Sequence, residues 1–244
     1  MRKLFVALTC FFPVFFLGSS CPSPEQFPPP PLSAPAFIGK DLTAAKFDVF
    51  RPAIHLTWKA PSADSVAIRE YVILSRSDDS AGFATIVRSI PDTVFDYYDN
   101  IDRIAVPAQN EIKPVYYRIF AIDTLGRNSD TSSIDSVMLS WPPKPLFPLM
   151  SDSMQPDSVV FTLTGVMGGY FPYIFLCSDS LGIFWKSPKP DTPTYSYADK
   201  TDRFIVNIPK NISFMRGSFY YWAVKVEIPT GNSQAIAISR FYVP

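Results

Sequence analysis

Few residues in this chain have the chemistry that catalysis needs. His55 is the only histidine among the 244 residues, so neither a Ser-His-Asp triad nor a usual zinc site can be assembled. Its strand alternates Ile54, Leu56 and Trp58 with polar residues, which places His55 on the outer face. Cys177 lacks a histidine to activate it as a nucleophile. The sequence therefore predicts a protein that is not an enzyme, with no cofactor and no metal.

A cluster of carboxylates offers the main alternative. Asp96, Asp99 and Asp102 lie close together in the sequence beside Tyr97 and Tyr98. Paired carboxylates can act as acid and base, and their spacing is also compatible with calcium. These residues follow a short strand and enter a loop, which is the simpler interpretation.

Aromatic side chains offer a second alternative, a ligand surface. Phe184 and Trp185, and then Tyr195 and Tyr197, lie in proline-rich stretches where we expect exposure. Exposed aromatic rings stack on sugar rings, so these four residues are the candidate surface for a carbohydrate. The competing interpretation is that they pack in the core and in hairpin contacts.

The composition indicates which elements position these residues. Twenty-five prolines against ten glycines, with 15% aromatic residues, suit short strands and rigid connections. No window of twelve or more residues beyond the N-terminus shows a convincing helical period. Lys+Arg and Asp+Glu balance at 22 each, so there is no electrostatic reason to expect a nucleic-acid partner.

The N-terminus reads as a targeting segment. Arg2 and Lys3 precede an apolar run from Leu4 to Leu17, and the small residues at 18–20 provide a cleavage site. The apolar run is short and is interrupted by Pro13, so a permanent membrane helix is the lesser interpretation. We predict a signal peptide over residues 1–20.

Cys21 follows these small residues directly. The arrangement resembles a bacterial lipoprotein lipobox, although Gly18 stands where that family usually has an aliphatic residue. The resemblance implies an acylated Cys21 that anchors the protein to a membrane. The alternative is ordinary cleavage after Ser20, which leaves a secreted protein with a free thiol. Residues 21–35 are rich in proline, so we expect them to form an extended tether.

Two similar strand–turn–strand units organise the rest of the chain. One lies at Val115–Ser133 and its echo at Phe219–Ser233, and each alternates aromatic and β-branched residues as a strand buried on one face does. Short strands at close spacing with turn signals predict an antiparallel sandwich. We therefore expect two tandem domains at 36–140 and 146–244, joined by a linker at 141–145.

The first domain resembles a fibronectin type III domain, an immunoglobulin-like seven-stranded sandwich. The resemblance rests on LTWKAP at 56–61, YVILSRS at 71–77 and YYRIFAIDTLGRNSDTSS at 116–133. It implies a core that contains Trp58, Tyr71, Tyr117, Ile119 and Ala121. Val115 occupies the position of the family's corner tyrosine.

The second domain resembles the same family at its end rather than its beginning. The segment GSFYYWAVKV at 217–226 matches the family pattern, with Tyr220 at the corner position and Trp222 in the core. The alternation of Tyr173, Phe175 and Cys177 places the thiol on one face of a strand as a small buried hydrophobe. We predict no disulfide.

The expected function combines these elements. The predicted fold class is all-β, with two tandem immunoglobulin-like (fibronectin type III) β-sandwiches after a signal peptide and a tether. We expect a non-catalytic envelope lipoprotein, lipid-anchored and weakly favouring the outer membrane, that acts as a scaffold or protein-interaction module with an envelope protein as partner. The alternative is a secreted or surface module that binds polysaccharide or mediates adhesion.

Overall fold

The structure is a computed structural model of the chain. It describes residues 32–61, 67–77, 82–104, 107–108, 111–149, 152, 154, 159–164, 171–178, 181–187, 194–196, 201–206, 212–228 and 233–244. The predicted signal peptide, Cys21 and most of the predicted tether lie outside these residues.

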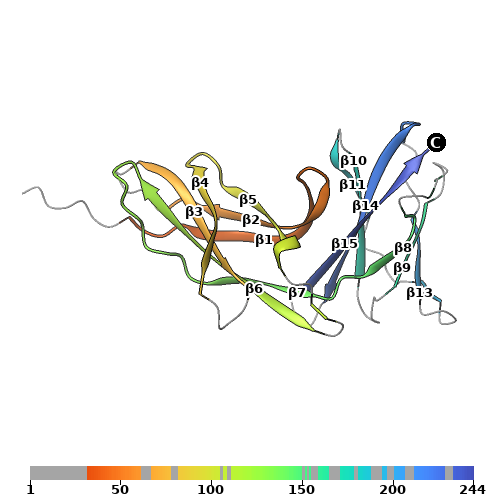
Figure 1. Cartoon of the computed structure of the whole chain (residues 1–244), viewed down its shortest axis with the longest axis horizontal. Helices are drawn as coiled ribbons and strands as arrows, with labels where there is room; N and C mark the ends of the chain where they lie inside the picture. The colour runs from red at the N-terminus through yellow and green to blue at the C-terminus, as the bar shows by residue number, and fades with distance from the viewer. Residues whose placement is uncertain are drawn as a thin grey trace, which may run out of the picture. The chain divides into compact units, whose positions relative to one another are not determined.

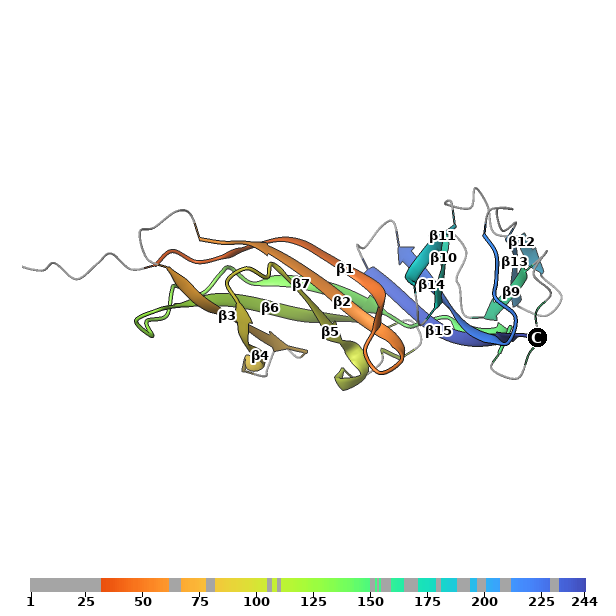
Figure 2. The ribbon, with the colours of Figure 1, turned by 90° about the horizontal axis from the view of Figure 1, so that it is seen from above.

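Two sheets form the first sandwich (Figure 2). One sheet has the order β1-β2-β5, and the strands of the other follow the order β4-β3-β6-β7. Every neighbouring pair among these strands is antiparallel. The strands are β1 (Ala36–Lys46), β2 (Phe50–Lys59), β3 (Ile68–Arg76), β4 (Ala84–Pro91), β5 (Asp96–Asn100), β6 (Ile112–Asp123) and β7 (Asp135–Ser140).

The core of the first sandwich follows the predicted alternation. β6 buries every second residue from Val115 to Asp123. Across the two sheets, the ring of Trp58 on β2 meets the ring of Tyr71 on β3 edge-on, with centroids 5.6 Å apart. All seven residues expected in the two cores are buried: Trp58, Tyr71, Tyr117, Ile119, Ala121, Tyr220 and Trp222. Leu32, inside the predicted tether, is buried against this core as well.

The second sandwich repeats this arrangement. One sheet has the order β12-β13-β9-β8 and the other β11-β10-β14-β15. The ring of Phe161 on β9 packs on Trp222 of β14, with centroids 4.6 Å apart. The strands are β8 (Lys144–Phe147), β9 (Val159–Thr164), β10 (Phe171–Ser178), β11 (Gly182–Lys186), β12 (Thr194–Ser196), β13 (Thr201–Val206), β14 (Ser218–Ile228) and β15 (Ser233–Val243). β8 begins inside the segment predicted as a linker.

The strand orders confirm the predicted fold class, two immunoglobulin-like β-sandwiches. In the first sandwich, β1, β2 and β5 lie in one sheet and β3, β6 and β7 in the other. In the second sandwich, β8, β9 and β13 lie in one sheet and β10, β14 and β15 in the other, which is the same arrangement. Tyr220 also forms the corner expected of it, because its hydroxyl accepts a 2.7 Å hydrogen bond from the backbone N–H of Met215. In the first sandwich Val115 fills the corresponding position as a buried apolar residue.

The last strands of the two sandwiches join. β7 and β15 pair in parallel, with Ser233 opposite Met138 and Gln234 opposite Leu139 (Figure 1). Through this pair, the two four-stranded sheets become one sheet of eight strands. A hydrogen bond to a side chain also crosses the join, from the backbone N–H of Leu42 to Oε1 of Gln234 at 2.8 Å.

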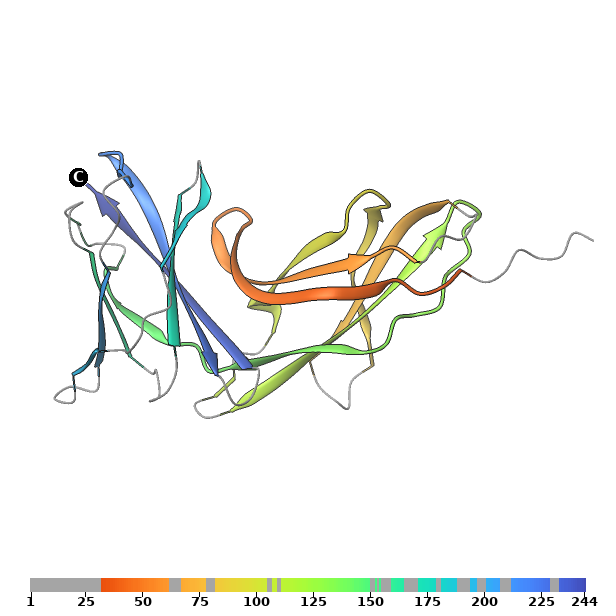
Figure 3. The same cartoon turned by 180° about the vertical axis from the view of Figure 1, so that it is seen from behind.

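β14 corrects one prediction. Its sequence was expected to bury one face, but every residue from Tyr220 to Val226 is buried. Tyr220, Trp222 and Val224 lie in the second core, whereas Tyr221 and Ala223 belong to the core of the first sandwich. The β1–β2 hairpin, which approaches β10 and β11 in Figure 3, provides the cover. Its Phe50 ring lies 5.1 Å from that of Tyr221.

Candidate interaction surface

The three carboxylates that could have formed a catalytic pair or a calcium site have different partners. Asp96 lies 3.1 Å from Nε2 of His55. Asp102 pairs with Arg51 and Asp99 with Arg103. In the part of the chain that the structure describes, no three His, Cys, Asp or Glu side chains gather as a metal site.

Asp99 instead organises a buried polar network inside the first sandwich. Its carboxylate accepts hydrogen bonds from the hydroxyl of Tyr117 at 2.6 Å and from Nε of Arg103 at 2.9 Å. Arg103 also donates to Oγ of Ser75 at 2.9 Å. Burial, reinforced by the neighbouring carboxylate, raises the pKa of Tyr117 far above its usual range. The network ties β5, β6 and β3 together, and Asp99 is its shared acceptor.

His55 forms part of a surface stack. Its ring lies parallel to that of Tyr98, with centroids 4.2 Å apart and an interplanar angle of 3°. His55 and Tyr98 are directly opposed across β2 and β5, which brings their side chains together on the outer face of the sheet. The outer-face position predicted for His55 is therefore the one observed, with Tyr98 and Asp96 as its neighbours.

Cys177 lies on the face of β10 that the first sandwich covers. It is a free thiol within the same cluster as Phe50 and Tyr221. Burial raises the pKa of this thiol to about 12, so it carries almost no thiolate at neutral pH. The chemistry of the position is that of a small apolar side chain.

The predicted carbohydrate surface is only partly described. Phe184 and Trp185 are half-buried and pack against the second core. The Phe184 ring meets those of Phe214 and Tyr220 edge-on. The backbone of Tyr195 lies in β12, and its side chain and the whole of Tyr197 lie outside the described residues. The Phe184 ring therefore packs against neighbouring rings and is only partly open to solvent.

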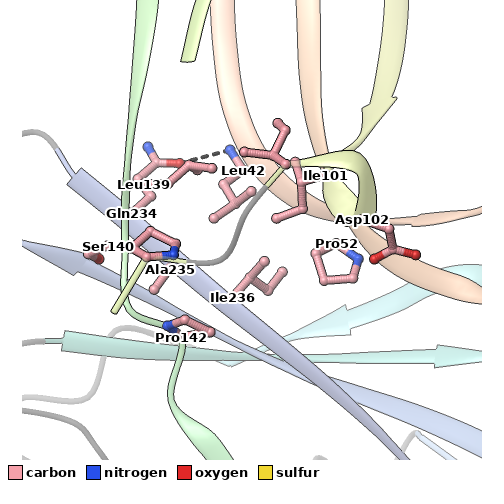
Figure 4. A pocket seen from close by; sticks show the side chains of 12 residues that line it. Leu42, Pro52, Ile101, Asp102, Leu139, Ser140, Pro142, Gln234, Ala235 and Ile236 are labelled. Atoms are coloured by element: carbon pink, nitrogen blue, oxygen red, sulfur yellow. Dashed lines mark hydrogen bonds between the residues drawn. The ribbon is translucent and has the colours of Figure 1, made fainter. Parts of the chain in front are cut away.

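A small cavity lies where the two sandwiches join (Figure 4). It has a volume of about 120 Å³, and Leu42, Ile101, Leu139 and Ile236 provide much of its apolar lining. An apolar cavity of this size holds a small apolar molecule at most. We interpret it as a packing gap at the join rather than as a substrate site.

The larger surface feature is a groove beside β5, which we call the β5 groove. It consists of two open hollows that share Phe47, Tyr97 and Tyr98 in their lining. The hollow on the side of the second sandwich has a volume of about 560 Å³ and includes Ile183 of β11. Phe47 and Tyr98 are each 39% exposed and Ile183 is 41% exposed, so the groove presents apolar area to solvent.

Single-strand patterns in the sequence do not predict this groove. Phe47 lies in the tight connection between β1 and β2, at a position where most hairpins carry polar residues. An aromatic residue at this turn position is the one feature of the sequence that could have indicated an exposed apolar surface here. Ile183 comes from the other sandwich, and only the docking of the two sandwiches brings it near Tyr98.

No protein-family model and no curated protein sequence matches the chain. The chain is similar to a crystal structure of the FN1-FN3 domains of chicken CNTN1, with 14% identity, a TM-score of 0.31 and coverage of 88% of this chain and 67% of that one. It is also similar to the Twitchin kinase region from C. elegans (Fn31-NL-kin-CRD-Ig26), with 14% identity, a TM-score of 0.34 and coverage of 61% and 32%. The fold assignment rests on the strand order and register described above. Over the described ranges, no helix is long and apolar enough to cross a bilayer.

Proposed function

We propose that this protein is a non-catalytic interaction module of a bacterial cell envelope, anchored through an acylated Cys21 and spaced from the membrane by the proline-rich tether. The two sandwiches act as one body that presents the β5 groove to an envelope protein. The observation that supports this most directly is the exposed apolar lining of the groove, with walls from both sandwiches. Surfaces of this kind mark interaction sites on soluble domains.

The competing function, carbohydrate binding at the aromatic residues of the second sandwich, has less support. A sugar platform needs ring faces open to solvent, and the ring of Phe184 is packed against two other rings. The exposed apolar residues of the β5 groove therefore favour a protein partner there.

Two measurements test the proposal. Intact mass of the native protein should show a diacylglyceryl adduct that the Cys21→Ser variant lacks, with membrane partitioning lost in the same variant. A photo-crosslinking amino acid at Tyr98 should give a discrete adduct in intact cells. The same amino acid at Leu125, which is 71% exposed in the turn after β6, serves as the control.

The outcomes separate the two parts of the proposal. A mass that matches plain cleavage after Ser20 removes the anchor and makes the protein secreted. Adducts that form equally at Tyr98 and Leu125, or at neither position, remove the groove as the interaction site.

A further inference from the structure

The register of β5 shows which of its backbone groups point away from the sheet. Trp58 N–H donates to the carbonyl of Phe95 at 3.1 Å. In an antiparallel pair, hydrogen-bonded and non-hydrogen-bonded positions alternate, so Tyr97 and Asp99 bond to β2. The N–H and C=O groups of Asp96, Tyr98 and Asn100 therefore point to the open side. Within the described residues, the sheet ends at β5.

This open edge runs along the β5 groove. Tyr98 lines both hollows, and its ring is stacked on His55, which holds it beside the edge. An extended chain that paired with Asp96, Tyr98 and Asn100 would lie over the apolar lining of the groove. Strand addition of this kind takes its affinity from main-chain hydrogen bonds and its specificity from alternate side chains.

The charges of the groove indicate the chemistry of such a chain. Asp96 is half exposed, and its neighbour on β2 is His55. Among the described residues, Asp96 contacts this histidine ring and not a lysine or arginine, whereas Asp99 pairs with Arg103 and Lys46 interacts with another residue. A carboxylate beside the aromatic residues Phe47 and Tyr98 matches a cation with an apolar stem. Lysine and arginine have that chemistry, since their charged heads pair with carboxylates and lie over aromatic faces.

We propose that the β5 groove binds an extended basic segment of a partner protein, which adds as a strand to β5 and places a lysine or arginine beside Asp96 and Tyr98. The proposal rests on the interaction function given above and names the partner's chemistry. Basic residues at every second position of the segment would lie on the same face of the sheet as Asp96, and one of them would lie beside it, because side chains alternate along a strand.

The probe for the test is an acetylated and amidated peptide of four Thr-Lys repeats, titrated into the 15N-labelled full chain. We expect saturable shifts of the amide signals of Asp96, Tyr98 and Asn100. A peptide of four Thr-Glu repeats should not bind. A Thr-Lys peptide that is N-methylated at alternate residues should also fail, because it keeps the charges but cannot pair along β5.

Matched variants assign the charge contact. Asp96→Asn should weaken the binding of the Thr-Lys peptide about threefold to fivefold, because an ion pair at a half-exposed site becomes a neutral hydrogen bond. Glu111→Gln, which removes an exposed carboxylate elsewhere on the same sandwich, should leave the affinity unchanged. The unperturbed amide spectrum of each variant shows that it remains folded.

The proposal is overturned if no saturable shift appears along β5. It is overturned equally if the N-methylated or the glutamate peptide binds as well as the parent peptide, or if Glu111→Gln weakens binding as much as Asp96→Asn. If any of these results is found but crosslinked adducts still form at Tyr98, the groove remains an interaction site and only the proposed basic strand is rejected. The absence of those adducts would reject the interaction function itself.

Discussion

The two sandwiches share a buried cluster, and the accessibility of the Cys177 thiol within it should report how tightly they are docked. Phe50 at the tip of the β1–β2 hairpin packs on Tyr221, and Cys177 lies in the same buried cluster. We expect Phe50→Ala to weaken the docking of the sandwiches and to expose the thiol more often. The measurement is the rate of alkylation of Cys177 under native conditions, in a chain in which Cys10 and Cys21 are serine.

The magnitude follows from the burial of the ring. Truncation of a buried phenylalanine to alanine costs about 3–5 kcal/mol, and the position of Phe50 at the end of a hairpin places it at the lower end, about 3 kcal/mol. If the thiol becomes accessible only when the sandwiches undock, the full loss of about 3 kcal/mol caused by the truncation shifts the equilibrium between the docked and undocked states. Because 1.4 kcal/mol is a factor of ten, alkylation should accelerate on the order of 100-fold.

Phe47→Ala is the matched control. Phe47 is in the same hairpin but is exposed and lies outside the buried cluster, so its truncation should leave the alkylation rate nearly unchanged. A rate for Phe50→Ala within about threefold of the parent chain would refute the reasoning, since Cys177 would then be protected without the hairpin. Equal acceleration by the two variants would point to general loosening of the hairpin.

Three further predictions concern stability. Asp99→Ala should lower the free energy of unfolding by about 2–4 kcal/mol in urea titrations, because the Tyr117 hydroxyl loses its acceptor; a loss below about 1 kcal/mol would contradict the network. Asp123 is buried, which opposes ionisation, but hydrogen bonds from the backbone and side chain of Arg127 outweigh this and lower its pKa. Its contribution is therefore present above the unfolded pKa of about 4 and lost as the pH falls through the lower folded value, and Asp123→Asn should flatten the acid limb of stability against pH. Tyr220→Phe should cost about 1–2 kcal/mol without changing the urea m-value, because the Met215 N–H loses its acceptor; an unchanged midpoint would argue against the corner.

Alternation along single strands was enough to predict much of the first sandwich. Val115, Tyr117 and Ile119 share one parity of β6, and that parity is the buried one. Trp58 and Tyr71 were assigned to the core by the same signal together with the family resemblance. A strand with one buried face carries this information locally, because burial depends only on its own sheet and the opposing one.

The join between the sandwiches could not be predicted in the same way. β14 reads as apolar on both faces through Tyr220, Tyr221, Trp222 and Ala223, a pattern that indicates burial on both sides. What covers the second face is a hairpin more than 150 residues earlier in the chain, and one sequence has no signal for that pairing.

Lys225 is a charged residue that is buried where the two sandwiches join. Its side chain is 2% exposed and pairs with Asp41 of β1 across the join. On an isolated sandwich, this residue would lie on the outer face of β14 and be solvated. A buried lysine is tolerated when it is paired, and separating it from its partner is strongly destabilising. The pair therefore favours one docked arrangement over sliding of one apolar face on another.

The join and the β5 groove are then coupled, because the groove takes Tyr98 from one sandwich and Ile183 from the other. A peptide that contacts both walls binds the docked state better than the undocked one, and linkage requires that it oppose undocking. At ten times its dissociation constant, such a peptide should slow the alkylation of Cys177 about tenfold. A saturating peptide that leaves the rate unchanged would bind to β5 alone, and Ile183→Ser would then have no effect on its affinity. A slowed rate, lost in Ile183→Ser, would show that the second sandwich forms part of the binding surface.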